Sequence, residues 1–141
     1  LSLSKDNIIK IMLKCSKWFN NNDLNSPFVY VPPAWAMGNV VWSDLGKLPY
    51  KLYETLTGVY YKNVFYPLPL AGYETDNLFR ILSVKFLNQI NDLYAKVTKN
   101  PLRVAIHPHD LELGLGDDLR RILSSDTTFY SYKQYFEKNN M

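Results

Sequence analysis

The spacing of apolar residues near the start of the chain predicts an amphipathic helix. Ile8, Met12, Cys15 and Phe19 recur at intervals of three or four residues, which places them on one face of a helix. Ser4 precedes this pattern and is a favourable N-cap, because its hydroxyl can accept a hydrogen bond from a free backbone N–H. A polar run then ends the helix.

A second and longer helix is predicted to begin at Thr75 or Asp76 and to end before Asn100-Pro101. Two short helices are expected further on, from Asp117 to Leu123 and from Tyr132 to Lys138. The long helix carries one apolar face, formed by Phe79, Leu82, Phe86, Ile90 and Leu93.

Extended segments separate these helices. Phe28–Val31, Leu102–Ile106 and Thr128–Tyr130 are rich in β-branched and aromatic residues and are predicted to be strands. Residues 50–60 and 63–68 form a β-rich insert, with Gly58 and Lys62-Asn63 as turn candidates. Strands that alternate with helices predict an α/β fold with mostly parallel strands, part of a deformed β/α barrel, with residues 1–141 as a single domain.

Composition narrows the class of protein. The net charge of +3 is small and the basic residues are scattered, so no nucleic-acid partner is expected. No apolar run reaches the length of a membrane span, and no signal peptide is seen, which leaves the compartment open. Because Cys15 is the single cysteine, no intramolecular disulfide can form. Because the sequence begins with Leu1, we expect a fragment or a processed product.

Both histidines of the chain, His107 and His109, follow the predicted strand 102–106 directly. Ligands of α/β folds bind at the carboxyl ends of strands, which makes this segment a candidate site. In extended geometry the two side chains would point to the same side. His107 suits general acid-base chemistry, and Asp110 could orient an imidazole. Alternatively, Pro108 and Asp110 simply form a turn with two solvated histidines.

A second candidate segment follows the strand 28–31. Pro32 and Pro33 stiffen this loop, and Trp35 could form an aromatic wall for a sugar ring. Trp35 could equally be a core residue beneath a strand end. The aromatic content of 15% leaves the same two interpretations open for the tyrosines.

Four segments together resemble a less-studied bacterial branch of the polysaccharide deacetylase (NodB-homology) superfamily. The His-Pro-x-Asp segment is the specific part of the resemblance, and the others support it. They are Val31-Pro32-Pro33-Ala34-Trp35, Tyr53-Glu54, Leu70-Ala71-Gly72-Tyr73-Glu74 and Arg103-Val104-Ala105-Ile106-His107-Pro108-His109-Asp110-Leu111.

The resemblance implies a metal-dependent carbohydrate N-deacetylase with this chain as its C-terminal portion. His107 would be the acid that protonates the leaving amine, and Asp110 would tune the imidazole. Substrate-binding residues would be Pro33, Trp35, Tyr73 and His109.

The family's Asp-Asp pair and His-x-x-x-His motif are absent from this sequence, as is the arginine of its second-strand Arg-x-Pro-Tyr motif. The divalent metal, zinc or a similar ion, would therefore be held by ligands outside this chain, and the isolated chain would be inactive. We also expect self-association through exposed strand edges.

Two other classes of function remain open. The first is a non-catalytic module that binds glycan or protein through Trp35 and neighbouring tyrosines. The second is a small metal-binding protein that uses His107, His109 and Asp110, across a dimer interface if necessary, because a metal site usually needs three protein ligands.

Overall fold

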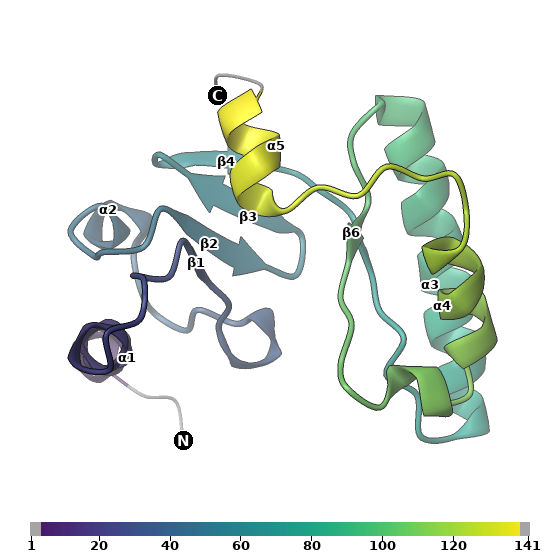
Figure 1. The fold of residues 1–141 in the computed structure, drawn as a ribbon, viewed down its shortest axis with the longest axis horizontal. Helices are drawn as coiled ribbons and strands as arrows, with labels where there is room; N and C mark the ends of the chain where they lie inside the picture. Colours follow the sequence, from purple (N-terminus) through teal and green to yellow (C-terminus); the bar gives the residue numbers. More distant parts are fainter. Residues whose placement is uncertain (1–3, 139–141) are drawn as a thin grey trace. The chain divides into compact units, whose positions relative to one another are not determined.

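The computed structural model describes residues 4–138 and shows a mixed α/β protein (Figure 1). The chain divides into two compact units at the boundary between Pro67 and Leu68. Each unit holds a small sheet that contains one parallel pair of strands. No helix among these residues is long and apolar enough to cross a membrane.

The first unit contains a four-stranded sheet in the order β1-β2-β3-β4. β1 pairs in parallel with β2, and the other pairs are antiparallel, so the predicted insert is a β-meander. Lys62 and Asn63 have φ of 49° and 64° and form the tight turn between β3 and β4, as predicted. The elements of this unit are α1 (Lys5–Asn21), β1 (Val29–Tyr30), η1 (Pro33–Trp35), α2 (Trp42–Leu45), β2 (Leu52–Thr55), β3 (Gly58–Tyr61) and β4 (Val64–Tyr66).

The predicted first helix is confirmed as α1, and the Ser4 hydroxyl accepts a hydrogen bond from the backbone N–H of Asn7. Its buried face differs from the predicted stripe at one position. Met12 and Ser16 are buried, whereas Cys15 is exposed. The core of the unit places Met12 together with buried aromatic and aliphatic side chains, namely Met37, Val40, Leu45, Leu48, Tyr50 and Tyr53.

The second unit is built on a parallel pair, β5 and β6, covered by α3 and α4 (Figure 1). Tyr73, Leu115 and Leu119 are buried in its core, and Ile81 and Val84 of α3 pack against them. The elements are β5 (Leu70–Ala71), α3 (Leu78–Thr98), β6 (Arg103–Val104), η2 (Asp110–Glu112), α4 (Gly116–Leu123) and α5 (Tyr132–Lys138).

Two asparagines of α3 hold this helix against the edge of β5. The Asn88 side chain accepts a hydrogen bond from the Gly72 N–H over 3.1 Å and donates one to the Gly72 carbonyl over 2.7 Å. Asn91 donates to the Leu70 carbonyl over 2.8 Å. The amides thereby satisfy backbone groups that would otherwise be left open at a strand edge.

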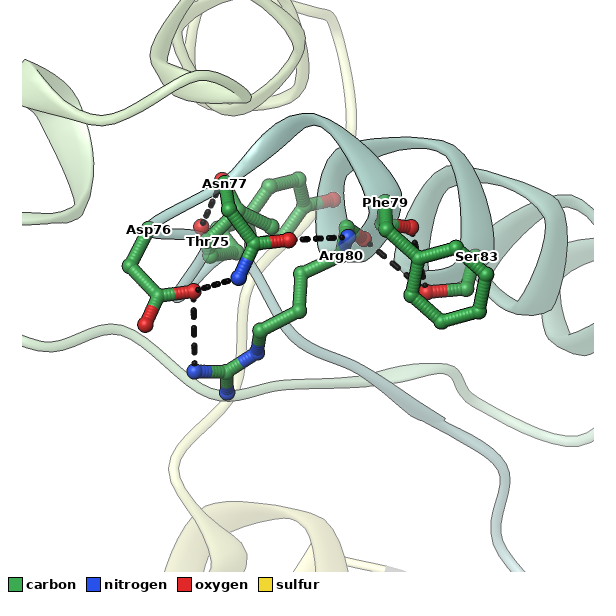
Figure 2. Close-up of polar contacts among 7 residues, drawn as sticks. Thr75, Asp76, Asn77, Phe79, Arg80 and Ser83 are labelled. Carbon is green, nitrogen blue, oxygen red and sulfur yellow. Dashed lines mark hydrogen bonds and ion pairs between the residues drawn. The ribbon is translucent and has the colours of Figure 1, made fainter.

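The N-terminus of α3 is fixed by a local polar network (Figure 2). Asn77, rather than Thr75 or Asp76, is the N-cap, and its side-chain oxygen accepts from the Arg80 N–H over 3.0 Å. Asp76 forms an ion pair of 3.2 Å with Arg80 and accepts a hydrogen bond from the Asn77 amide. The long helix therefore starts at Leu78, two or three residues later than predicted.

Several predicted elements were wrong in detail. Thr128–Tyr130 forms no strand and is exposed, because these residues have no partner strand. Gly58 begins β3, and the turn before it is formed by Leu56 and Thr57. Asp117 lies in the first turn of α4, whose N-cap is Leu115.

Candidate functional site

His107 and Asp110 form the closest pair of titratable groups among the predicted site residues. Parallel pairing with β5 positions β6, and His107 follows β6 at its carboxyl end. The Asp110 Oδ2 atom accepts a hydrogen bond from the His107 backbone N–H over 2.8 Å. The same oxygen lies 3.4 Å from His107 Nδ1. Asp110 therefore fixes both the backbone and the ring edge of His107.

The two side chains differ sharply in exposure. Asp110 is 0% exposed, whereas the His107 side chain is 48% exposed. With Nδ1 facing the carboxylate, the Nε2 atom on the other side of the ring is left for a ligand. Asp110 Oδ1 is buried and has no hydrogen-bond partner among the described residues. A buried oxygen without a protein partner costs free energy.

His109 does not join this pair. Its Nδ1 atom lies 3.6 Å from Glu112 Oε2, and both side chains are largely exposed. The expectation of two histidines on one side of an extended segment was wrong, because residues 107–110 form a turn closed by the Asp110 N–H and the His107 carbonyl. Within residues 4–138, no three His, Cys, Asp or Glu side chains are grouped so that they could hold a metal ion.

The loop after β1 holds Trp35 in an unusual backbone conformation. Ala34 and Trp35 have φ of 50° and 53°, in the left-handed region that costs energy for residues with a Cβ atom. The Trp35 Nε1–H donates a hydrogen bond to Glu54 Oε1 in β2. Pro33, at the start of this loop, is exposed, and Trp35 is half-buried. The indole is thus held by its polar edge and keeps part of its surface accessible.

Tyr73 lies in the core of the second unit and is only 2% exposed. Burial, followed by the nearby Asp118 and Asp92 carboxylates, raises the pKa of its phenol above the ordinary value. It lines a shallow pocket of about 240 Å³ with Asn88, Lys85 and Arg121. Tyr73 therefore forms part of the pocket wall, and its ring has no open face for stacking.

Two residues of structural importance were not singled out as site residues from the sequence. Glu54 is buried in β2 and anchors Trp35. A carboxylate inside a predicted strand is the signal that could have found it, because a buried charge needs a partner. Asn88 holds α3 to the sheet, and its position among apolar helix residues was the available signal.

Comparison with known proteins found no matching family model, no matching curated protein and no matching solved structure. The functional interpretation of the chain therefore rests on the arrangement of its own residues.

Proposed function

We propose that this chain is the C-terminal portion of a carbohydrate N-deacetylase in which His107 acts as the catalytic acid. One observation carries the proposal: a half-exposed imidazole at the end of a parallel strand contacts a fully buried carboxylate through Nδ1. This arrangement orients an imidazole so that its other nitrogen faces the substrate.

The proposed reaction is the hydrolysis of an N-acetyl group on a sugar, in which the C–N bond breaks and the departing amine needs a proton. His107 would deliver this proton from Nε2, while Asp110 accepts a hydrogen bond from Nδ1–H and holds the ring orientation. A divalent metal would activate the attacking water in such an enzyme. Residues 4–138 do not fit that metal by themselves, and the proposal assigns its ligands to another part of the protein.

We also propose a barrel architecture for the whole protein. The parallel pairs β1–β2 and β5–β6 would be segments of a deformed β/α barrel, since barrels of this type place their sites at the carboxyl ends of parallel strands. In the first unit, Pro33 and Trp35 would contact the sugar or acetyl group. In the second unit, His109 would bind substrate from its exposed position, and Tyr73 would act as part of a pocket wall.

The test is acetate release from an N-acetylated oligosaccharide by the longest natural form of the protein. His107→Ala should lower kcat by about 10²–10⁴-fold with an unchanged fold, because the leaving amine loses its acid. Asp110→Asn should also lower kcat, because a neutral amide does not hold the Nδ1–H tautomer of His107 as a carboxylate does. His109→Ala is the matched control and should chiefly affect KM. Full activity of His107→Ala would contradict the proposal.

A second candidate is a glycan-binding module, and the strained backbone at Ala34 and Trp35 favours it. Strain of this kind persists where a side chain must be held for a ligand. If this candidate is correct, chitooligosaccharide binding by the chain should be lost in Trp35→Ala. It should survive in His107→Ala and in Trp18→Ala, a matched change at an exposed tryptophan.

A further inference from the structure

The outer face of α3 carries the most extensive exposed apolar surface on any helix of the described chain. Its inner face packs on the sheet through Ile81, Val84 and Ala95, and yet the opposite face is also apolar. Phe79 is 80% exposed and Val97 74% exposed. The exposed apolar residues of α3 are Leu78, Phe79, Leu82, Phe86, Leu87, Ile90, Leu93, Tyr94 and Val97.

We call this set of side chains the outer face of α3. Together they present on the order of 1,000 Å² of accessible apolar surface, which exceeds the few hundred Å² of the largest patch on most monomers. A stable interface needs about 800 Å² from each partner. The area of the outer face is therefore large enough for a stable dimer.

The outer face has the seven-residue repeat of a helix–helix seam. Phe79, Phe86 and Leu93 recur every seven residues, and a second row follows four residues after each of them. This second row is Ser83, Ile90 and Val97. Alternating three- and four-residue steps keep both rows on one side of a helix and match the packing of two nearly antiparallel or parallel helices.

We propose that the outer face of α3 binds the same face of a second copy of this chain, with the two helices antiparallel. A two-fold axis near residue 88 would place Phe79 opposite the partner's Val97, Phe86 opposite the partner's Ile90, and Ser83 opposite the partner's Leu93. Every layer then pairs a larger side chain with a smaller one, as close packing requires. A parallel pair would instead oppose Phe86 to Phe86 and Ser83 to Ser83, which places two large side chains in one layer and two small ones in another.

The charges of α3 fit this arrangement. Arg80 and Lys96 flank the seam, and in the antiparallel register they would face Tyr94 and Leu82 of the partner rather than a like charge. Arg80 is also held by Asp76, away from the ring of Phe79 (Figure 2).

The first experiment is sedimentation velocity of the chain over a range of concentrations. We expect a reversible monomer–dimer equilibrium that Phe86→Glu weakens by at least ~30-fold, as loss of a central anchor does. Phe129→Glu is the matched control at an exposed residue outside α3 and should leave the equilibrium unchanged. Because Phe86 is exposed in the monomer, circular dichroism of the variant should be unaltered.

A cross-linking experiment tests the direction of the helices. In a Cys15→Ser background, chains with Ser83→Cys are mixed with chains with Leu93→Cys and oxidised in air. The antiparallel register predicts a mixed disulfide dimer in preference to either homodimer. A monomer at every concentration, a dimer unaffected by Phe86→Glu, or preferential Ser83→Cys homodimers would each overturn the proposal, which is independent of the deacetylase activity.

Discussion

The Trp35 Nε1–H donates a hydrogen bond to Oε1 of Glu54 across 3.2 Å. The contact joins the loop that follows β1 to β2, the parallel neighbour of β1. Glu54 is only 7% exposed, so its carboxylate depends on protein donors in place of water. The hydrogen bond from Trp35 to the buried Glu54 of β2 therefore positions the loop.

Trp35→Phe should destabilise the chain by about 1–2 kcal/mol, because the buried carboxylate of Glu54 loses a donor while most of the ring volume is kept. Chemical denaturation followed by circular dichroism measures this change. Trp18→Phe is the matched control: Trp18 is 56% exposed, and its substitution should change the free energy of unfolding by less than ~0.5 kcal/mol. Equal effects of the two substitutions would show that the bond to Glu54 contributes nothing.

Asn88→Ala should lower the free energy of unfolding by about 2–3 kcal/mol, since it leaves both the N–H and the carbonyl of Gly72 without their partner. Thermal and urea denaturation provide the measurement. Gln89→Ala, at the neighbouring exposed position, is the control and is expected to be nearly neutral. If Asn88→Ala is as stable as the control, α3 is not held by its amide.

Gly58→Ala should destabilise the first unit by about 1–3 kcal/mol. A Cβ atom at this position would lie 2.3 Å from the Tyr66 carbonyl oxygen and 2.7 Å from the Phe65 ring, so the β3–β4 pair would have to shift. Gly72→Ala is the matched control, because its Cβ would meet nothing within 4 Å. Denaturation curves for the two variants should therefore separate clearly, and coincident curves would contradict the close approach at Gly58.

Alkaline pH should destabilise the chain. Burial raises the pKa of Tyr30, Tyr50, Tyr53 and Tyr73 above the ordinary value of 10.0. Between that value and the raised values, the unfolded chain releases phenolic protons that the folded chain retains, so stability is full below pH 10 and falls above it. Tyrosinate absorbance during a pH titration should rise together with unfolding.

Tyr53→Phe provides the control for that titration. The variant loses the hydrogen bond of 2.8 Å to the Leu45 carbonyl, which costs about 1 kcal/mol at neutral pH. Its stability should then fall less steeply above pH 10, because one raised phenol is gone. An unchanged slope would mean that Tyr53 does not contribute to the alkaline transition.

Local signals in the sequence predicted much of the secondary structure. The Ser4 cap and the apolar spacing located α1, and Lys62-Asn63 located a turn, because these features act over a few neighbouring residues. Thr128–Tyr130 has the composition of a strand and yet forms none. A strand needs a partner, and partners are set by tertiary contacts that composition does not contain.

The candidate site was predictable in its members but not in its geometry. The position of His107 after a strand was correct, and its contact with Asp110 agrees with the suggestion that this carboxylate orients an imidazole. The placement of His109 failed, because the turn that begins at Pro108 rotates it towards Glu112. The long helix shows the same limit: its apolar stripe was recognised, but the spacing alone did not reveal that Phe86 faces solvent.

The amides of Asn88 and Asn91 determine at which edge the small sheet of the second unit could pair with a further strand. Both side chains form hydrogen bonds with backbone groups on the outer edge of β5. An additional strand would need the same groups for its own pairing. A further strand can join beside β5 only by displacing α3, whereas joining beside β6 leaves that helix in place. Any larger sheet that includes this pair would therefore extend from β6, so a deformed barrel built on the pair would stay open beside β5. Chains would also be protected from pairing edge to edge through β5.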